Sequence, residues 1–469
     1  MDEFDFMMEK EIHEECGVFG IFEVDSASEV AYYALHSMQH RGQEGCGIVS
    51  SDGDKLYGHR ATGSVREVFK ENDLKKCQGN SAIGHVRYAT AGGSHMNNIQ
   101  PFLFHHSTGD FGLCHNGNLI NSKQMKQKCE ASGSIFQSSS DTELLAHLIT
   151  KNAKNTRIEA ILEALPQLEG SFAFLVLTKD KLYAMRDKYG LRPLSLGKMN
   201  GGYVVSSETC AFDIIGAHFI RDIEPGEIIT ISEEGIDSVF YATDCVKKIC
   251  AMEYIYFSRP DSDICGINVH KSRKSCGRQL AKEAHIDADI VIGVPDSSLS
   301  AASGYAEESK IPLEMGLIKN KYVGRTFIEP SQELREKGVK MKLSPIRSVV
   351  NGKRIILIDD SIVRGTTSLQ IVTMLKEMGA TEVHMRIASP PIIAPCFYGV
   401  DTSTYDELIC AFKDVDEVCA EIGADSLQYL SEEGLCEAIG TSDMCLACFN
   451  GVYPTPLFDS LAEANKDTK

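Results

Sequence analysis

The clearest hydrophobic pattern in the chain is a short apolar run that ends in two acids. Residues 355–358 are four consecutive apolar residues, three of them β-branched, and Asp359 and Asp360 follow directly. A continuous apolar run of this length is typical of a parallel strand covered on both faces. The glycine- and hydroxyl-rich segment 365–368 then precedes the apolar segment 369–375. This order predicts a strand, a short loop and a helix that begins near residue 365.

The junction between this strand and this helix is suited to binding an anion. The first backbone N–H groups of a helix have no partner within it, and the helix dipole favours negative charge there. Adjacent carboxylates can hold the hydroxyls of a sugar or a Mg2+ ion. The pattern equally fits a strand that ends in two solvated acids before an ordinary helix cap. It is not a P-loop, because GxxxxGK[ST] does not occur near it.

Patterns elsewhere predict an α/β protein in two parts. Strands are expected over 172–177, 182–185, 203–206 and 289–294, and helices over 142–152 and 157–165. The strand pattern of the first part gives way near residues 241–248, where we place the domain boundary. The first domain is then 16–247 and the second 248–469.

Composition narrows the class of protein. At 469 residues the chain is long enough for two domains that each bury a core. Its formal net charge of −19 disfavours non-specific binding to nucleic acid or to anionic membranes. The sequence has no apolar run of the ~18 residues that a transmembrane helix needs. Residues 1–15 carry seven acids and one lysine, unlike a signal or transit peptide. We therefore expect a cytoplasmic protein without a nucleic-acid or membrane partner.

The sixteen cysteines do not show the short, even spacings of a disulfide framework. Reduced thiols, metal or cluster ligands and one nucleophile are the better expectations. Cys445 and Cys448 form a CxxC pair, and Cys250 and Cys396 lie far from it in sequence. Local spacing alone makes zinc the first interpretation and plain thiols the second. It cannot specify an iron–sulfur cluster, because zinc and such clusters both take thiolates.

The segment IILIDDSIVRGTTS, residues 355–368, resembles the signature with which type I phosphoribosyltransferases bind phosphoribosyl pyrophosphate (PRPP). The resemblance implies a mainly parallel sheet for this part of the chain. It implies that Asp359 and Asp360 hold the ribose hydroxyls and a Mg2+ ion. The 5-phosphate would then lie on Arg364, Gly365, Thr366, Thr367 and Ser368.

Cys16 stands directly before the apolar segment 17–22. In isolation, a cysteine before a strand is usually a buried thiol. The segment CGVFGIF, however, resembles the start of the mature class II glutamine amidotransferases. That resemblance implies that residues 1–15 are a leader removed on maturation, that the Cys16 thiol is the nucleophile, and that its freed α-amino group is the base. An α-amine titrates near ~8, so it can accept a proton near neutral pH.

Four further motifs follow in the order of that family: LHSMQHRGQE at 35–44, GHVRYAT at 84–90, CHNGNL at 114–119 and SSDTE at 139–143. The resemblance assigns Arg87 to the α-carboxylate of glutamine and Asp141 to its α-ammonium. It assigns the Asn116 side chain and the Gly117 N–H to the oxyanion hole. Taken singly, HNG fits a plain turn and Arg87 a surface ion pair. For this half the family implies the αββα sandwich of the N-terminal-nucleophile (Ntn) hydrolases.

The second half opens with CAMEYIYFSRPDS, residues 250–262, which resembles the same region of amidophosphoribosyltransferases. By this resemblance Ser297, in a VPDS loop, contributes to the Mg2+–PRPP site; by itself it fits a capping serine equally well. Residues 319–343 are rich in charge and glycine, which is typical of a solvated loop. The family implies a flexible lid there, with contacts from Lys319, Lys321, Tyr322 and Arg325.

The CxxC pair and the two distant cysteines also match this family. Cys250, Cys396, Cys445 and Cys448 correspond to the ligands of its cluster-bearing subgroup, which implies a [4Fe–4S] cluster. The reaction implied is the conversion of PRPP, glutamine and water to 5-phosphoribosylamine, glutamate and pyrophosphate, the first step of de novo purine biosynthesis. The family further implies one Mg2+ per subunit, a homo-oligomer (a tetramer) and feedback inhibition by purine nucleotides. We also predict that a closed, PRPP-loaded lid activates the glutaminase, because free ammonia would escape or become protonated in water.

Two other classes share parts of these motifs. A different Ntn amidotransferase, such as glucosamine-phosphate synthase, needs sugar-isomerase domains in place of IILIDDSIVRGTTS. A non-enzymatic PRPP-sensing regulator that binds DNA needs a basic surface or a helix-turn-helix, which the charge of −19 does not favour. Glutamine-dependent release of pyrophosphate, measured against retention of DNA, separates the enzyme from the regulator.

Overall fold

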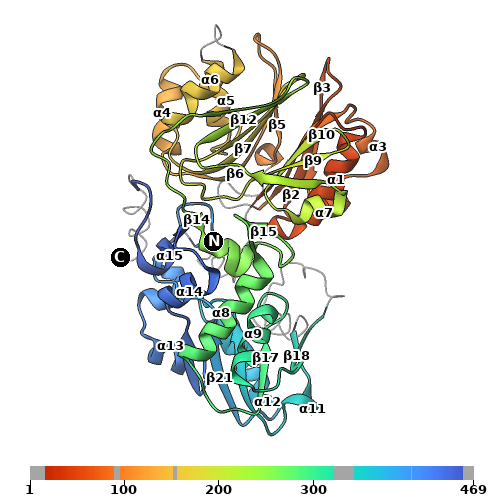
Figure 1. The fold of residues 1–469 in the computed structure, drawn as a ribbon. Helices are drawn as coiled ribbons and strands as arrows, with labels where there is room; N and C mark the ends of the chain where they lie inside the picture. The colour runs from red at the N-terminus through yellow and green to blue at the C-terminus, as the bar shows by residue number, and fades with distance from the viewer. Residues whose placement is uncertain (1–15, 89–95, 152–155, 321–342, 403, 458–469) are drawn as a thin grey trace, which may run out of the picture.

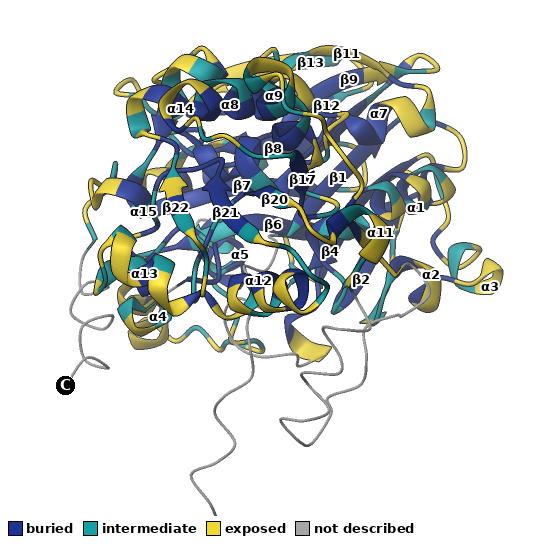
Figure 2. Cartoon of the chain, turned by 90° about the horizontal axis from the view of Figure 1, so that it is seen from below, coloured by how far each residue is buried: buried dark blue, intermediate teal, exposed yellow. Residues whose placement is uncertain are grey.

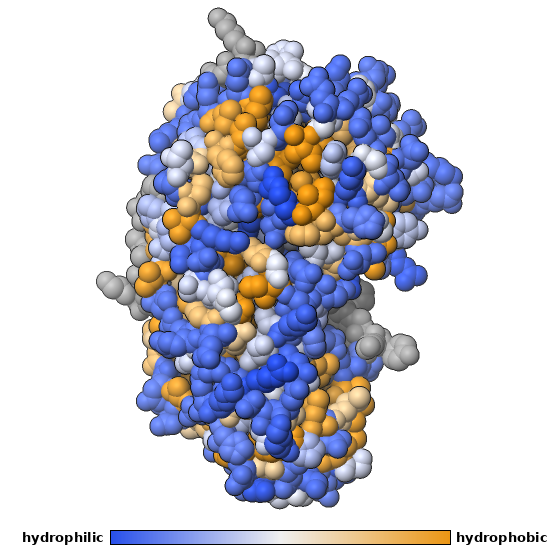
Figure 3. Space-filling view, in the orientation of Figure 1, coloured by the Kyte–Doolittle hydropathy of each residue, from blue (hydrophilic) through white to orange (hydrophobic). Residues whose placement is uncertain are grey.

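The computed structural model describes residues 16–88, 96–151, 156–320, 343–402 and 404–457. The chain forms two lobes that follow one another in sequence (Figure 1). The upper lobe in that view holds two sheets with helices on their outer faces, and the lower lobe holds helices around a small parallel sheet. On the face drawn in Figure 3, apolar residues are interspersed with hydrophilic ones over both lobes.

The first sheet of the upper lobe has seven strands, with β1 (Gly17–Phe22) at its centre. β1 pairs antiparallel with β10 (Gly202–Ser206) on one side and β4 (Ser81–Arg87) on the other. Every residue of β1 is buried, because helices and the second sheet pack on the two faces of its sheet. The remaining strands are β11 (His218–Asp222), β9 (Ser195–Met199), β2 (Gly45–Ser51) and β3 (Leu56–Thr62).

The second sheet has six antiparallel strands, with β6 (Phe111–Leu119) and β7 (Gly170–Leu177) paired inside it. Its other strands are β13 (Gly235–Phe240), β12 (Glu227–Ser232), β8 (Leu182–Arg186) and β5 (Phe102–Phe104). Apolar side chains such as Val18, Ile83 and Leu175 fill the space between the two sheets.

Helices complete two outer layers of this sandwich. α1 (Ala27–Ser37) and α7 (Cys210–Ile215) pack on the seven-stranded sheet. α4 (Ser122–Ala131), α5 (Glu143–Thr150) and α6 (Arg157–Ala164) pack on the six-stranded sheet. The order is therefore helices, sheet, sheet, helices, and the predicted αββα sandwich is confirmed.

The lower lobe is built on four parallel strands in the order β17 (Ile290–Gly293), β20 (Arg354–Asp359), β21 (Glu382–Ile387) and β22 (Ser426–Tyr429). The predicted apolar strand lies within β20. Its side chains alternate between two cores, with Ile356 and Ile358 in one and Ile355 and Leu357 in the other. All four are fully buried, as a strand covered on both faces requires.

Helices cover this sheet on both sides, and their outer faces are exposed (Figure 2). The helices are α8 (Val269–Glu283), α9 (Leu299–Ser309), α11 (Arg347–Val350), α12 (Thr366–Glu377), α13 (Val415–Glu421) and α14 (Glu432–Ile439). The predicted mainly parallel sheet is confirmed. The strands predicted at 172–177, 182–185, 203–206 and 289–294 and the helices at 142–152 and 157–165 each correspond to an observed element with shifted ends.

The two halves are joined through short strands between the lobes. Eight residues separate β14 (Ile249–Cys250) from the end of β13, and β14 pairs in parallel with β23 (Met444–Cys445) near the C-terminus. The N–H of Cys250 donates to the carbonyl oxygen of Leu191 in the upper lobe at 3.1 Å. The segment 241–248, where the boundary is predicted, thus connects the last strand of the sandwich to this junction.

Candidate active sites

Cys16 lies at the entrance to the central strand of the sandwich. It directly precedes β1 and is half-buried, and its Sγ lies 3.6 Å from the carbonyl oxygen of Tyr88. Its own carbonyl oxygen accepts a hydrogen bond from Arg41 Nε at 3.1 Å. The position of the thiol is therefore fixed by a buried strand on one side and by a charged hydrogen bond on the other.

The surroundings of the thiol disfavour its ionised form. Burial raises the pKa of the Cys16 thiol, and the nearby Asp141 carboxylate adds to this, while the Tyr88 hydrogen bond and the Arg87 and Arg41 charges oppose it. The thiol is thus protonated near neutral pH and needs a base to become a nucleophile. Arg87 and Asp141, the predicted partners of glutamine, both lie close enough to act on it electrostatically.

The predicted oxyanion hole lies on β6, linked to the start of β1. Asn116 is fully buried, and its Nδ2 donates to Ser207 Oγ at 3.3 Å. The same Oγ accepts the N–H of Val18 at 3.0 Å. Gly117 has φ of +141°, and a Cβ there would lie 2.2 Å from the carbonyl oxygen of Ser171. Only glycine fits this position, so the backbone can present its N–H at this point.

Asp141 is held in its ionised form. Its Oδ2 accepts the N–H of Leu119 at 2.8 Å, and its Oδ1 lies 3.5 Å from Nδ1 of His115. Burial alone raises the pKa of Asp141, but the His115 interaction and backbone N–H groups outweigh it and lower the pKa below the ordinary value. A fixed, partly buried carboxylate of this kind can receive an ammonium group.

In the lower lobe, the two predicted acids lie together at the carboxyl end of β20. Asp359 and Asp360 are each 8% exposed. Ser298 Oγ donates to Asp359 Oδ1 at 3.0 Å and lies 3.4 Å from Asp360 Oδ2. Burial and then the neighbouring Asp360 raise the pKa of Asp359 well above its usual range. Burial also raises the pKa of Asp360, opposed by hydrogen bonds from Ser297 and others and by the charge of Arg273.

This pair of acids fits a hard cation. Two adjacent buried carboxylates destabilise each other when both are ionised, and an oxygen-coordinated Mg2+ relieves that repulsion. Ser297, the third residue predicted to contact the Mg2+ ion, donates a hydrogen bond to Asp360 and so lies beside the two acids. Carboxylate and hydroxyl oxygens are the donors that Mg2+ prefers, so the residues present match the predicted metal.

The predicted phosphate loop forms the N-terminus of α12. Gly365 precedes the helix with φ of +79°, and no side chain caps the first turn. The first turn contains Thr366, Thr367 and Ser368, as predicted from the sequence. The guanidinium of Arg364 lies 2.5 Å from the carboxylate of Glu407. The uncapped turn leaves backbone N–H groups available for a phosphate.

Most of the predicted lid lies outside the described residues, including Lys321, Tyr322 and Arg325. Lys319 is described: its Nζ lies 3.1 Å from Asp296 Oδ2, in the loop that also holds Ser297. The two ends of the lid are paired, because β18 (Leu317–Lys319) and β19 (Leu343–Pro345) form a small antiparallel sheet.

The four predicted cluster cysteines line one cavity between the lobes, although they come from three distant parts of the sequence. Cys250 and Cys445 are register partners in the β14–β23 pair. The N–H of Tyr398 donates to Cys396 Sγ at 3.4 Å. Burial raises the pKa values of Cys250 and Cys445 to about 12, and raises that of Cys448 well above its usual value. None of the sixteen cysteines forms a disulfide.

The arrangement of these thiols bears on which group they can hold. Within the described residues, no group of three or more His, Cys, Asp or Glu side chains is arranged to hold a metal ion. The thiols instead surround a cavity whose other lining side chains are largely apolar. A zinc ion needs four ligands at about 2.3 Å from one point, whereas an iron–sulfur cluster occupies a larger space between its thiolates. Four thiols around one largely apolar cavity are a donor set that a zinc ion or an iron–sulfur cluster can take.

Known proteins share both halves of this chain. Residues 85–213 match the glutamine amidotransferase domain family, and residues 269–388 match the phosphoribosyl transferase domain family. The amidophosphoribosyltransferase of Bacillus subtilis (strain 168) is 56% identical over 456 residues, which are 96% of each chain. The chain belongs to the amidophosphoribosyltransferase family. It is a glutamine-dependent pentosyltransferase of the first step of purine biosynthesis.

Further members support the same assignment. The amidophosphoribosyltransferase of Staphylococcus aureus (strain COL) is 53% identical, over 96% of this chain and 92% of its own. A solved structure of glutamine PRPP amidotransferase from B. subtilis, complexed with ADP and GMP, superposes with a TM-score of 0.91 at 56% identity. It covers 94% of this chain and 98% of its own. The fold of the whole amidophosphoribosyltransferase is therefore shared, not only that of each half.

Several polar residues of this family member were not predicted from the sequence. Ser298 contacts both Asp359 and Asp360, whereas the sequence predicts its neighbour Ser297. Arg41 and Glu253 lie within the motifs 35–44 and 250–262, but their neighbours in sequence do not distinguish them from ordinary charged residues. Their burial and their pairing across the two halves appear only in the fold. No helix among the described residues is both long and apolar enough to span a membrane.

Proposed function

We propose that each half carries one half-reaction, and that ammonia passes between them. The observation that carries this proposal is the separate convergence of two predicted residue sets. Cys16, Arg87 and Asp141 interact electrostatically in the sandwich. Asp359 and Asp360 lie at the carboxyl end of the parallel sheet, next to the loop that leads into α12. Ammonia released in water would become protonated or diffuse away, which gives a physical reason for joining the two reactions in one chain.

In the proposed glutaminase reaction, Arg87 binds the α-carboxylate of glutamine and Asp141 its α-ammonium. Once residues 1–15 are removed, the α-amine of Cys16 takes the thiol proton, and the sulfur attacks the side-chain amide carbon. Asn116 Nδ2 and the Gly117 N–H donate to the oxyanion that forms. Collapse of this intermediate breaks the C–N bond, the α-ammonium returns its proton to the leaving nitrogen, and ammonia departs. Water then hydrolyses the thioester to glutamate and regenerates the thiol.

In the proposed transferase reaction, Arg364, Gly365 and the first turn of α12 bind the 5-phosphate of PRPP. Asp359 and Asp360 orient the ribose hydroxyls and, with Ser297, would hold one Mg2+ ion. That ion supplies positive charge for the pyrophosphate. Ammonia forms the new bond to C1 of the ribose as the bond to pyrophosphate breaks. The resulting ammonium group then loses one proton to water to give 5-phosphoribosylamine. Lys319, with Lys321, Tyr322 and Arg325 of the lid, would shield this centre from water.

The four cavity-lining cysteines would hold a [4Fe–4S] cluster. Their place around one cavity, their origin in three chain segments and the N–H donor to Cys396 support this assignment. Such a group would be structural, because it joins the beginning of the second half to its C-terminal segment.

We further propose a cytoplasmic homo-oligomer, with a tetramer expected from the family, inhibited by purine nucleotides. The support for nucleotide binding is that the B. subtilis relative has been solved in complex with ADP and GMP. Neither a nucleic acid nor a membrane is required by the proposed reaction.

The deciding experiment measures pyrophosphate release from PRPP and Mg2+ under anaerobic conditions, with glutamine or with ammonium as nitrogen donor. We expect release with both, and one glutamate per pyrophosphate in the glutamine assay. Cys16→Ala should abolish the glutamine reaction and spare the ammonium reaction. Cys46→Ala, which removes a buried thiol from strand β2 of the same sheet, is the matched control and should retain both. Loss of both reactions in Cys16→Ala would contradict the division of labour.

A further inference from the structure

Arg41 connects the backbone of the nucleophile to the interior of the molecule. It ends a single 3₁₀ turn, Gln39–Arg41, and its side chain is fully buried. Its Nε donates to the carbonyl oxygen of Cys16 at 3.1 Å. This hydrogen bond orients the main chain of Cys16, and with it both the thiol and the nitrogen that becomes the α-amine. Arg41 would not touch glutamine itself, so any effect it has on the reaction acts through Cys16.

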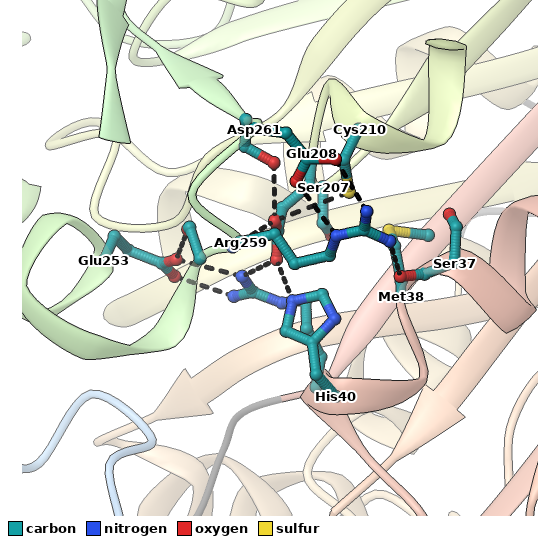
Figure 4. A network of polar contacts seen from close by, with 12 residues as sticks. Ser37, Met38, His40, Ser207, Glu208, Cys210, Glu253, Arg259 and Asp261 are labelled. Carbon is teal, nitrogen blue, oxygen red and sulfur yellow. Dashed lines mark hydrogen bonds and ion pairs between the residues drawn. The ribbon is translucent and has the colours of Figure 1, made fainter. Parts of the chain in front are cut away.

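The guanidinium of Arg41 binds two carboxylates that come from different halves of the chain. Its Nη1 lies 2.7 Å from Glu208 Oε1, in the sandwich. Its Nη1 and Nη2 donate to Glu253 at 2.9 and 2.7 Å, in the turn Glu253–Phe257 that opens the second half. Figure 4 shows the Glu208 and Glu253 side chains converging from their two ribbons. With Arg192, 3.5 Å from Glu253, the cluster holds two cations and two anions, all without side-chain exposure.

The second half holds Glu253 from the other side. Ser258 Oγ donates to Glu253 Oε2 at 2.6 Å. Arg273 of α8 donates to the carbonyl oxygens of Tyr254 and Ser258, each at 2.7 Å. The charge of Arg273 also acts on Asp360 of the PRPP site. The turn that carries Glu253 is therefore held by Arg273, whose charge also acts on Asp360.

We propose that Arg41 is a positioning residue for Cys16, and that Glu253, supplied by the phosphoribosyltransferase half, sets the position of Arg41. The inference rests on the proposed function and adds a route between its two sites. The glutaminase is then fully assembled only when the turn 253–257 is in the place that Arg273 and Asp360 define. We expect PRPP bound at Asp360 to influence Cys16 through Arg273, the turn 253–257 and Arg41.

The geometry explains why a small change at Glu253 matters. A planar guanidinium that binds a carboxylate with two donors cannot follow that carboxylate without turning its third donor, Nε, away from Cys16. The surrounding side chains are close-packed, so the cluster cannot absorb a shift by loose rearrangement. Misplacement of a nucleophile by ~1 Å can reduce turnover ~10²-fold. Lysine keeps the charge at position 41 but has no planar fork to hold three acceptors at once.

The test uses the full-length processed protein with Arg41→Lys, Glu253→Gln and the double variant. Arg259→Lys is the matched control: its guanidinium also bridges the halves, donating to the Ser37 carbonyl and pairing with Asp261, but makes no contact with Cys16 or Glu253. For each protein, kcat and KM for glutamine are measured with and without PRPP–Mg2+, together with ammonium-dependent pyrophosphate release and the thermal midpoint.

Both single variants should lower the kcat for glutamine ~10- to 100-fold, with KM changed less than threefold, because Arg87 and Asp141 are untouched. The factor by which PRPP–Mg2+ stimulates glutamine hydrolysis should fall towards one in Glu253→Gln. Ammonium-dependent release should stay within about twofold of the parent. The double variant should be no worse than the poorer single variant, since the two residues act through one contact. Arg259→Lys should behave as the parent protein.

Three outcomes would overturn the inference. The first is an unchanged kcat and PRPP stimulation in Glu253→Gln, and the second is additive losses in the double variant. The third is a parallel loss of the ammonium reaction, which would make the cluster a general support of both lobes. A parent protein that releases no pyrophosphate with either nitrogen donor would instead contradict the proposed function, so the two failures are distinguishable.

Discussion

At the scale of single residues, the pair Asp359 and Asp360 links stability to pH. An acid with a raised pKa binds its proton more tightly in the folded chain, so stability falls as pH rises from about 3.8 through the raised pKa. Asp359→Asn should therefore raise the thermal midpoint at neutral pH without Mg2+, by about 2–4 °C for each kcal/mol of repulsion removed. It should give no gain near pH 3, where the parent is protonated, and should remove the stabilisation by Mg2+ and PRPP.

Asp289 supplies a control of opposite sign at the neighbouring strand. Its pKa is lowered by hydrogen bonds from the backbone and side chain of Arg354, so its carboxylate stabilises the fold above its ordinary pKa. Asp289→Asn should lower the midpoint at neutral pH and leave the response to Mg2+ intact. Thermal melts at several pH values, with and without Mg2+, distinguish the two. A destabilised Asp359→Asn at neutral pH would contradict the role of repulsion.

Gly117 gives a second test at this scale. A Cβ at this position would lie 2.2 Å from the Ser171 carbonyl oxygen, so the backbone of the oxyanion strand must shift. Gly117→Ala should reduce glutamine-dependent turnover ~10²-fold or more, as loss of an oxyanion donor does, and spare the ammonium reaction. Gly109→Ala is the control, because Gly109 also has positive φ but meets nothing within 4 Å. Equal losses in both variants would show a general backbone effect.

At the scale of elements, the segment after Cys396 is attached to the oxyanion strand β6. Asn118 Nδ2 donates to the Phe397 carbonyl oxygen at 2.9 Å. Ser171 Oγ donates to the Tyr398 carbonyl oxygen at 2.7 Å and accepts the Asn118 N–H at 3.0 Å. Ser171→Ala should destabilise the protein by about 1–3 kcal/mol. It should lower glutamine-dependent turnover more than ammonium-dependent turnover, because β6 carries Asn116 and Gly117.

Ser51 is a close match for this test. It is equally buried, donates to the Lys179 carbonyl oxygen at 2.7 Å and accepts the Gly53 N–H at 3.1 Å, but lies away from Cys16. Ser51→Ala should cost similar stability with no selective effect on the glutamine reaction. Denaturant melts and the ratio of the two activities provide the comparison. An unchanged ratio in Ser171→Ala would show that this attachment does not position the oxyanion strand.

Local sequence patterns predicted some of these elements, whereas contacts between the two halves were not predictable from them. β20 was predictable because four apolar residues in a row are informative locally, and the uncapped start of α12 was signalled by its Gly-Thr-Thr-Ser run. Arg41 and Glu253 were not, because a charged residue does not reveal from its neighbours that it will be fully buried. Their pairing joins positions 212 residues apart, and only the docking of the two halves creates it. Ser298 was not predicted because the sequence does not show which of the adjacent serines 297 and 298 faces the two acids, just before α9 begins.

At the scale of the whole molecule, the cysteine cavity is lined by parts of the chain that lie far apart in sequence. Cys250 lies at the start of the second half, Cys445 and Cys448 lie near its end, and the segment after Cys396 reaches the sandwich. A cluster bound there would therefore brace both lobes at once. Its loss should release the C-terminal segment and the support of β6 together.

We therefore expect protein purified without oxygen to contain about four iron and four sulfide per chain, if the proposed [4Fe–4S] cluster is present. Exposure to air should bleach the visible absorbance, lower the thermal midpoint, and reduce the glutamine- and ammonium-dependent activities in parallel, because the brace supports both lobes. Cys448→Ser should reproduce these changes without oxygen. Cys436→Ser, a part-buried thiol that does not line the cavity, should keep its iron and both activities. Equal iron in the two variants, or zinc in place of iron, would refute the cluster assignment while leaving both active sites as proposed.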